Sequence, residues 1–233
     1  MNTNTENKEK EIEAAANTAV PQDSTSEPID FTYIENARKP VGELGGTVLD
    51  DMNESHAALT EWGFSHLHFG STVLDVGCGG GNALRLAMHQ DPGAEFFGID
   101  YSDVSIEKAT SFNGEAVMSG RLSLKKASVS SLPFRDSFFD TVYSVESYFF
   151  WPDLPGDMRE ICRVLKTGGT FAIIVEMVAG DMSDRFEKIT EHLHMNVLAP
   201  EQLAEVYRQA GFTDVTYDWD KEKGWLVMQG RKA

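Results

Sequence analysis

The stretch that decides the fold is Thr72-Val73-Leu74-Asp75-Val76-Gly77-Cys78-Gly79-Gly80-Gly81-Asn82-Ala83-Leu84-Arg85-Leu86-Ala87. Its first five residues form a short, largely apolar run bounded by turn residues, which predicts a buried central strand of a parallel sheet. The glycines that follow lack a Cβ atom, so the backbone can bend sharply and lie close to a ligand. Apolar residues then recur at helical spacing, at Leu84, Ala87 and Met88. A strand, a glycine turn and a helix in this order predict a binding site at the carboxyl end of the strand.

The spacing of these glycines distinguishes two kinds of cofactor site. A dinucleotide fingerprint, G-x-G-x-x-G, requires a third glycine where this chain has Asn82. The pattern here is Asp75-x-Gly77-x-Gly79-x-Gly81, which closely resembles motif I of class I S-adenosylmethionine (AdoMet)-dependent methyltransferases. The resemblance implies that the turn lies against the methionine part of AdoMet and that Asp75 supports its ammonium group. The alternative is a glycine turn that only closes a strand–helix corner.

A second acidic residue follows at the end of the next predicted strand. Residues 95–100 form that strand, and Asp100 ends it about two dozen residues beyond the glycine turn. A carboxylate at this position can accept strong hydrogen bonds from both ribose hydroxyls of a nucleoside. The adjacent Tyr101 is predicted to pack on the adenine ring. The alternative for Asp100 is a helix N-cap, because a helix is predicted over 103–119.

The segment Ala127–Phe134 resembles the family's loop that holds adenine. Where the family typically has an acid, this chain has Ser128, whose hydroxyl can meet the adenine amino group without charge assistance. The resemblance assigns the backbone N–H of Val129 to a ring nitrogen of adenine. The departure at Ser128 concerns the strength of adenine recognition and leaves the location of the adenine site unchanged.

The fourth predicted strand, 138–145, leads into a loop rich in aromatic residues. The resemblance implies that this region borders both the methionine moiety, here through Ser144, and the methyl acceptor. Glu146 is the predicted acceptor contact or proton acceptor, and a structural, salt-bridged carboxylate is an equal alternative. Four consecutive aromatic residues, 148–151, cannot all point into one core from a loop, so at least one should line the acceptor site. Tyr148 and Trp151 are the predicted acceptor-binding residues.

The remaining chain predicts the rest of an α/β fold. The resemblance covers 70–233 and is closest to small-molecule methyltransferases of the ubiquinone/menaquinone-biosynthesis type; it implies a Rossmann-like seven-stranded sheet of order 3-2-1-4-5-7-6. Residues 122–126 predict an edge strand, and a final antiparallel hairpin is predicted over 212–230. Further helices are predicted over 50–62, up to Gly168, within 179–197 and over 200–210. The domain prediction is a disordered acidic tail over 1–28, a helical cap over 29–70 and an AdoMet-binding methyltransferase domain over 71–233.

The composition of the chain indicates which classes of binding partner it should exclude. A net charge of −17 over 233 residues should repel nucleic acid, and no basic stripe compensates for it. Two cysteines and the lack of a long apolar segment predict a cytoplasmic protein with no membrane span.

The histidine pairs His66/His68 and His192/His194 have the spacing of metal chelators on a strand, but no cysteine or carboxylate cluster accompanies them, so no metal site is predicted. The oligomeric state is left open. Arg38, next to Lys39, either reaches the AdoMet carboxylate or is a solvated basic residue, and the second is favoured.

The sequence therefore predicts an AdoMet-dependent methyltransferase acting on an O, N or C nucleophile of a small molecule. Three alternatives stay open. A non-catalytic AdoMet-binding module would keep the cofactor motifs, and an NAD-dependent oxidoreductase would share the glycine turn and the ribose-binding acid. An aminopropyltransferase would use the same fold, but it would need an acidic polyamine pocket for which Glu146 alone is thin support.

Overall fold

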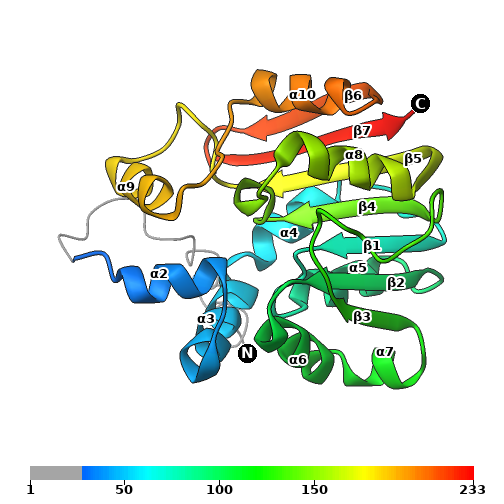
Figure 1. The fold of residues 1–233 in the computed structure, drawn as a ribbon, viewed down its shortest axis with the longest axis horizontal. Coiled ribbons are helices and arrows are strands. Elements are labelled where there is room, and N and C mark those ends of the chain that lie inside the picture. Colours follow the sequence, from blue (N-terminus) through cyan, green and yellow to red (C-terminus); the bar gives the residue numbers. More distant parts are fainter. Residues whose placement is uncertain (1–27) are drawn as a thin grey trace, which may run out of the picture. The chain divides into compact units, whose positions relative to one another are not determined.

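The computed structural model describes residues 28–233, and Phe31–Ala233 form one compact unit. The predicted disordered tail falls on residues that lie, apart from Pro28, outside this described range. A seven-stranded sheet has the order β3-β2-β1-β4-β5-β7-β6, which confirms the prediction (Figure 1). Its strands are β1 (Thr72–Val76), β2 (Glu95–Asp100), β3 (Leu122–Lys126), β4 (Phe139–Val145), β5 (Leu165–Val175), β6 (Phe212–Asp220) and β7 (Trp225–Lys232).

Strands β1 to β5 run parallel and β7 pairs antiparallel with β5 and β6, so the chain ends in the expected hairpin. The helices are α2 (Phe31–Arg38), α3 (Gly42–Ser55), α4 (Ala57–Phe64), α5 (Asn82–Gln90), α6 (Asp103–Phe112), α7 (Gly114–Met118), α8 (Leu154–Val164), α9 (Asp184–Leu193) and α10 (Pro200–Gln209), with a 3-10 turn η1 (Tyr148–Phe150).

The sheet separates two apolar cores because successive side chains of a strand point to opposite faces. Along β1, Val73 joins the core under α4 and α5, whereas Leu74 and Val76 join the core under α8 and α10. Along β5, Ile173 and Ile174 divide in the same way. Residues of a central strand are thus buried on both faces, which explains the continuous apolar runs in the sequence.

Three predicted helices differ in extent from the observed ones. The single helix predicted over 50–62 is two, α3 and α4, because the backbone of His56 (φ −88°, ψ 1°) departs from the helical conformation. The helix predicted over 103–119 breaks at Asn113, whose amide donates to the Gly81 carbonyl (3.0 Å). Helix α8 ends at Val164 instead of Gly168, because Phe138 N–H captures the Val164 carbonyl (2.7 Å) and β5 begins there.

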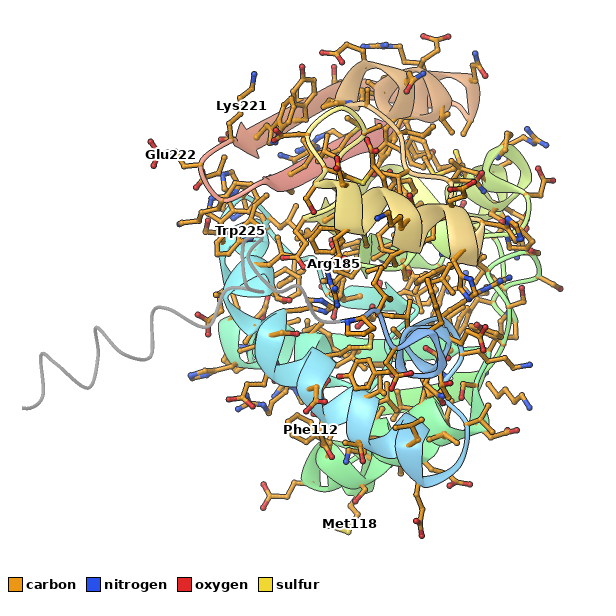
Figure 2. All side chains as sticks on the ribbon, turned by 90° about the vertical axis from the view of Figure 1, so that its left-hand side faces the viewer. Phe112, Met118, Arg185, Lys221, Glu222 and Trp225 are labelled. Carbon is orange, nitrogen blue, oxygen red and sulfur yellow. The ribbon has the colours of Figure 1, made fainter. Side chains whose placement is uncertain are left out.

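Apolar exposure on the described surface is scattered. Figure 2 shows Met118 at the end of α7 and Phe112 at the end of α6, with 83% and 42% of their surfaces exposed. The charged turn of the terminal hairpin, with Lys221 and Glu222, projects from the edge of the fold (Figure 2). Among the residues that the structure describes, none of the helices has the length and apolar character needed to cross a membrane.

Candidate functional site

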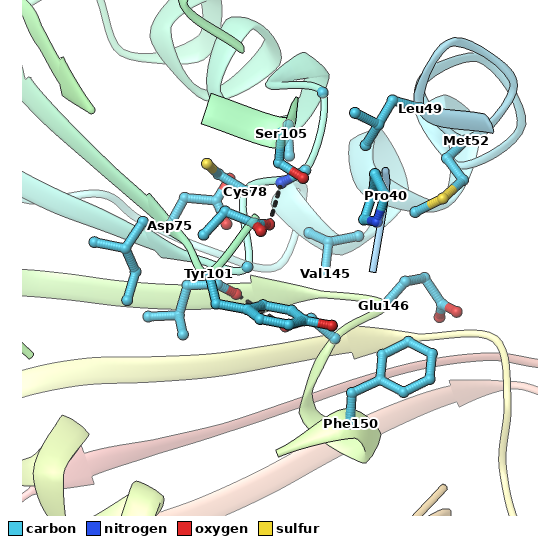
Figure 3. A pocket seen from close by; sticks show the side chains of 18 of the residues that line it. Pro40, Leu49, Met52, Asp75, Cys78, Tyr101, Ser105, Val145, Glu146 and Phe150 are labelled. Atoms are coloured by element: carbon cyan, nitrogen blue, oxygen red, sulfur yellow. Dashed lines mark hydrogen bonds between the residues drawn. The ribbon is translucent and has the colours of Figure 1, made fainter. Parts of the chain in front are cut away.

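A cavity of about 380 Å³ lies at the carboxyl ends of β1, β2 and β4. The glycine turn and the loop after β4 form part of its wall, and residues of α3 form another part. Figure 3 shows Asp75 and Cys78 toward one side of this space and Glu146 and Phe150 toward the other. Its volume falls in the range typical of small-molecule sites, and it opens where ligands bind in open α/β sheets.

The glycine turn has the backbone conformation that its sequence requires. Gly77 and Gly79 have φ values of +80° and +49°, in the left-handed region that side chains disfavour. A Cβ atom on Gly77 would lie 2.5 Å from the Ser147 hydroxyl, so this glycine lets the loop after β4 approach the turn. At Gly79 the nearest atom to such a Cβ is Leu49 Cδ2 at 3.6 Å, so Gly79 faces more open space.

Asn82, the residue that breaks the dinucleotide fingerprint, fastens the helical cap. Its side-chain amide donates to the Asn53 carbonyl on α3 (2.7 Å), and its backbone N–H donates to the Asn53 side chain (3.4 Å). The Asn53 Nδ2 is buried without a hydrogen-bond partner at the edge of the cavity. A glycine at position 82 would remove the side chain that ties α3 to the turn.

Asp75 is an unsatisfied buried carboxylate at the cavity wall. Its exposed fraction is 1%, and neither oxygen has a hydrogen bond of standard geometry. Burial and the charge of Asp100 raise the pKa of Asp75 well above its usual range, while the nearby Tyr143 hydroxyl acts in the opposite direction. A buried carboxylate left in this state favours a cationic ligand, because such a ligand supplies both charge and donors.

Asp100 ends β2 and faces the same cavity. Its Oδ2 accepts from the Gly79 N–H (3.1 Å) and its Oδ1 from the Ser102 N–H (2.8 Å). Burial raises its pKa, which these hydrogen bonds counteract. Ser102, and not Asp100, caps α6 through its hydroxyl, so the N-cap alternative for Asp100 is wrong. Tyr101 lines the cavity with 40% of its surface exposed, and its hydroxyl donates to the Arg38 carbonyl.

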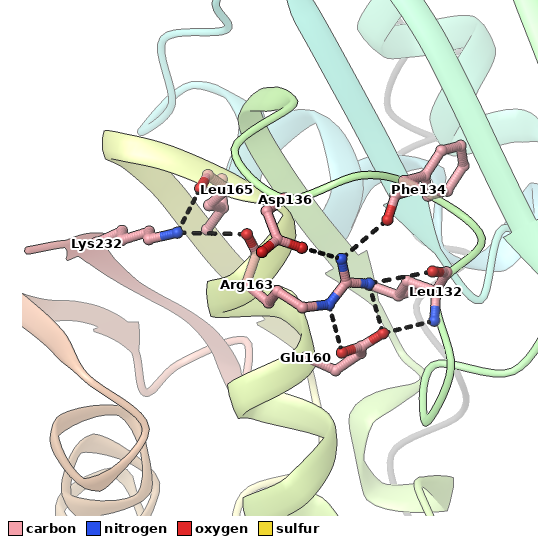
Figure 4. Close-up of polar contacts among 7 residues, drawn as sticks. All are labelled: Leu132, Phe134, Asp136, Glu160, Arg163, Leu165 and Lys232. Carbon is pink, nitrogen blue, oxygen red and sulfur yellow. Dashed lines mark hydrogen bonds and ion pairs between the residues drawn. The ribbon is translucent and has the colours of Figure 1, made fainter.

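The predicted adenine loop borders the cavity through Ser128 and Val129. Residues of α8 hydrogen-bond to its backbone at Leu132 and Phe134. Figure 4 shows the Arg163 guanidinium donating to the carbonyls of Leu132 (3.1 Å) and Phe134 (2.9 Å). Glu160 accepts from Arg163 (2.6 and 2.8 Å) and from the Leu132 N–H (2.9 Å). Hydrogen bonding with Arg163 holds the pKa of Glu160 below its usual range. We call Glu160 and Arg163 the α8 clamp.

Glu146 occupies the opposite end of the cavity. It is 7% exposed, has a left-handed φ of +49°, and its Oε1 accepts from the Glu176 N–H (2.6 Å). Burial, followed by the charge of Glu176, raises the pKa of Glu146 well above its usual range. His56 Nε2 lies 3.9 Å from Glu176 Oε1, and burial lowers the pKa of His56 to about 4. Glu146 therefore lies beside two ionisable residues, Glu176 and His56, whose proximity was not predicted from the sequence.

Three other predicted site residues lie in different places. Ser144 is fully buried and does not line the cavity; its hydroxyl hydrogen-bonds that of Ser147 (2.6 Å), which does. Tyr148 belongs to the core, where its hydroxyl accepts from the Leu198 N–H (3.1 Å), so its position does not support acceptor binding. Trp151 lines the cavity, as does Phe150, which the acceptor-site prediction had omitted. Two of the four aromatic residues over 148–151 therefore line the cavity, and their contact with an acceptor stays a prediction.

The histidine pairs do not form chelating sites in the described chain. His66 Nε2 pairs with Asp218 (3.3 Å) and His192 Nε2 with Glu35 (3.1 Å). Arg38 lines the cavity, and its guanidinium donates to the Leu193 carbonyl (3.4 Å). The residues that the sequence missed at the site are Asn53, His56, Phe150 and Glu176. Only Glu176 carried a signal, as the acid directly after a buried strand.

Comparison with known proteins now adds to the geometry. Residues 74–173 match the family described as "Methyltransferase domain". This part of the chain is therefore similar to methyltransferase domains. A sterol 24-C-methyltransferase from Aspergillus fumigatus is 41% identical over 105 residues, which are 45% of this chain and 27% of that protein. An O-methyltransferase from Aspergillus sclerotiorum is 33% identical over 149 residues, which are 61% of this chain and 55% of that protein. The chain thus spans from about a quarter to just over half of these relatives' lengths.

A solved structure extends the likeness beyond the matched residues to most of the chain. A chain of the Haloferax volcanii complex that contains the Trm112 methyltransferase activator superposes with a TM-score of 0.70 at 25% identity, covering 80% of this chain and 93% of that one. AdoMet is the cofactor that this class of domain implies, and the residues present fit it. Asp75 offers an unpaired carboxylate for an ammonium group, Asp100 offers acceptors for ribose, and Gly79 leaves space for a ligand.

Proposed function

We propose that this protein transfers the methyl group of AdoMet to an O, N or C nucleophile of a small molecule. The observation that carries the proposal is the division of one cavity into two chemically different ends. Asp75, which is suited to the ammonium group of the cofactor, borders one end, while Glu146 and Phe150 border the other (Figure 3). Asp100, which is suited to the ribose, also lines the cavity and lies near enough to Asp75 for its charge to raise the pKa of Asp75. A methyl donor and an acceptor held in this way meet within a single cavity.

When bound, AdoMet supplies an activated methyl group on a sulfonium, so the chain's task is to hold and orient. Asp75 would bind the cofactor's ammonium, Asp100 its ribose hydroxyls, and Ser128 and Val129 its adenine. Tyr101 would pack on the adenine ring. Phe150 and Trp151 would exclude water around the acceptor. Glu146 would contact the acceptor or take its proton, because burial raises the pKa of this carboxyl and makes its carboxylate a stronger base.

Several features support a small, partly apolar acceptor of the kind used in ubiquinone/menaquinone-type methylation. The acceptor end has aromatic walls, and the relatives named above are a sterol methyltransferase and an O-methyltransferase. A net charge of −17 argues against nucleic acid as acceptor. The same acidity and the two free cysteines suit a cytoplasmic location.

A methyl-transfer screen tests the proposal directly. The purified protein is incubated with AdoMet and a library of small hydroxylated, amine and isoprenoid compounds, and mass spectrometry follows S-adenosylhomocysteine and any product one methyl group heavier. We expect at least one compound to be methylated by the wild type and not by the Asp100→Ala variant. Tight AdoMet binding with no methylated product across the library would favour a non-catalytic AdoMet-binding module instead.

A further inference from the structure

Three side chains that commonly bind metals converge at the acceptor end of the cavity. His56 lies between α3 and α4, Glu146 follows β4, and Glu176 follows β5. One possible ligand atom from each residue lies within 4.8 Å of the other two. Among the histidine, cysteine and acidic side chains of residues 28–233, these three form the one group whose ligand atoms lie close enough together to hold a metal ion. His56 and Glu146 also line the cavity, so an ion held there would be reachable from it.

The distances leave space for an ion between the side chains. His56 Nε2 and Glu176 Oε1 are 3.9 Å apart, too far for a hydrogen bond. Nitrogen and oxygen ligands lie about 2.0–2.2 Å from a zinc-sized ion, so two ligands on one ion are separated by about 3–4 Å. The Glu176 backbone N–H holds Glu146 through Oε1 (2.6 Å), which fixes one oxygen and leaves Oε2 for a ligand. The spacing of His56 and Glu176 therefore matches that of two ligands on one ion, and Glu146 lies within 4.8 Å of both.

Charge also favours a cation at this position. Across residues 28–233, neither Glu146 nor Glu176 forms an ion pair with a lysine or arginine. Two neighbouring carboxylates, both largely buried, are costly without a counter-ion. A set of one imidazole and two carboxylates is suited to a divalent transition metal.

We propose that His56, Glu146 and Glu176 bind a divalent transition-metal ion, such as Zn²⁺ or Mn²⁺, at the acceptor end of the cavity. Three protein ligands leave coordination positions open. If the proposed methyltransferase function holds, on which this extension rests, an open position facing the cavity would bind an oxygen of the acceptor. Such a metal would lower the pKa of an acceptor hydroxyl and orient it. The structure then favours an acceptor with a hydroxyl or carboxylate beside its apolar part.

Titration with Co²⁺ of the metal-free full-length protein, followed by visible absorption and calorimetry near neutral pH, tests the site without any enzyme assay. We expect one Co²⁺ per chain, with the absorption bands of a low-symmetry nitrogen and oxygen site. Replacing a residue that only hydrogen-bonds to a metal ligand typically lowers metal affinity about 10–100-fold. Removing a ligand itself, in His56→Gln or Glu176→Gln, should therefore weaken Co²⁺ binding by about 100-fold or more.

Matched variants exclude surface binding. His66→Gln and His192→Gln remove histidines that pair with carboxylates elsewhere on the surface, and both should bind Co²⁺ like the wild type. Circular dichroism and AdoMet calorimetry on every variant show whether the fold and cofactor site persist. Absence of stoichiometric Co²⁺ binding, or binding that His56→Gln and Glu176→Gln leave unchanged, would overturn the metal site. AdoMet binding in the same samples would show that the cofactor site survives that result, and the methyl-transfer screen would test the proposed function separately.

Discussion

Glu146 combines a left-handed backbone, burial and a carboxylate neighbour at the acceptor end of the cavity. Its raised pKa means that the wild-type carboxyl takes up its proton at a pH above the ordinary carboxyl value. If Glu146 accepts the acceptor's proton in the metal-free protein, turnover should fall on the acidic side around that raised pKa; a bound metal ion would instead keep the carboxylate ionised and remove this acidic limb. Glu146→Gln keeps the shape and removes the charge, so it should lower turnover by about 10²-fold and abolish this acidic limb.

Single-turnover methyl transfer across a pH series, with AdoMet affinity measured in parallel, checks this prediction for Glu146. The affinity for AdoMet should change little, because the cofactor's charged groups are assigned to the other end of the cavity. A Glu146→Gln enzyme with the wild-type rate and pH profile would leave Glu146 as a structural carboxylate.

Asp100 gives a separate prediction at the same scale, on the cofactor. Asp100→Ala removes the charged acceptor for the ribose hydroxyls and also the partner of the Gly79 N–H. AdoMet binding should weaken by about 2–3 kcal/mol, measured by calorimetry. Asp103→Ala, three residues away in a surface pair with Lys126, is the matched control and should bind AdoMet normally. Equal affinities for Asp100→Ala and wild type would remove Asp100 from the ribose site.

At the scale of elements, the α8 clamp (Glu160 and Arg163) holds the predicted adenine loop against helix α8 through hydrogen bonds to the loop backbone. Arg163→Ala leaves Glu160 without its partner and two loop carbonyls without donors. We expect a loss of about 2 kcal/mol in the free energy of unfolding and weaker AdoMet binding, measured by urea denaturation and calorimetry. Arg208→Ala removes an exposed pair with Glu205 one turn away and should cost less than about 0.5 kcal/mol. Similar losses in both variants would contradict the role of the clamp.

How far the sequence predicted the structure also differs between elements. The strand, turn and helix over 72–90 were predictable because their pattern is local and each level of it agrees. The positions of His56 and Glu176 were not, because they approach Glu146 only after α3, β4 and β5 have packed. The 3-10 turn η1 decides which aromatic faces the cavity, and its side-chain directions do not follow from composition. Hence Phe150 was missed and Tyr148 was assigned in its place.

For the whole molecule, the composition of residues 1–27 gives a prediction that the structure does not test. This segment has few large apolar residues and therefore offers little surface to bury. Deleting it should leave the Tm within about 5 °C of the full chain and the AdoMet affinity nearly unchanged. Differential scanning calorimetry of the two proteins checks this. A larger fall in Tm would show that the segment packs on the domain.

At the scale of the whole molecule, the cavity should bind AdoMet and not a dinucleotide. Calorimetric titration of one protein preparation with AdoMet, S-adenosylhomocysteine and NAD tests this specificity most directly. The cavity predicts that AdoMet and S-adenosylhomocysteine each bind once per chain and that NAD does not, because Asn82 replaces the third fingerprint glycine and fastens α3 across the turn. Binding of NAD in preference to AdoMet would contradict the account and favour an oxidoreductase.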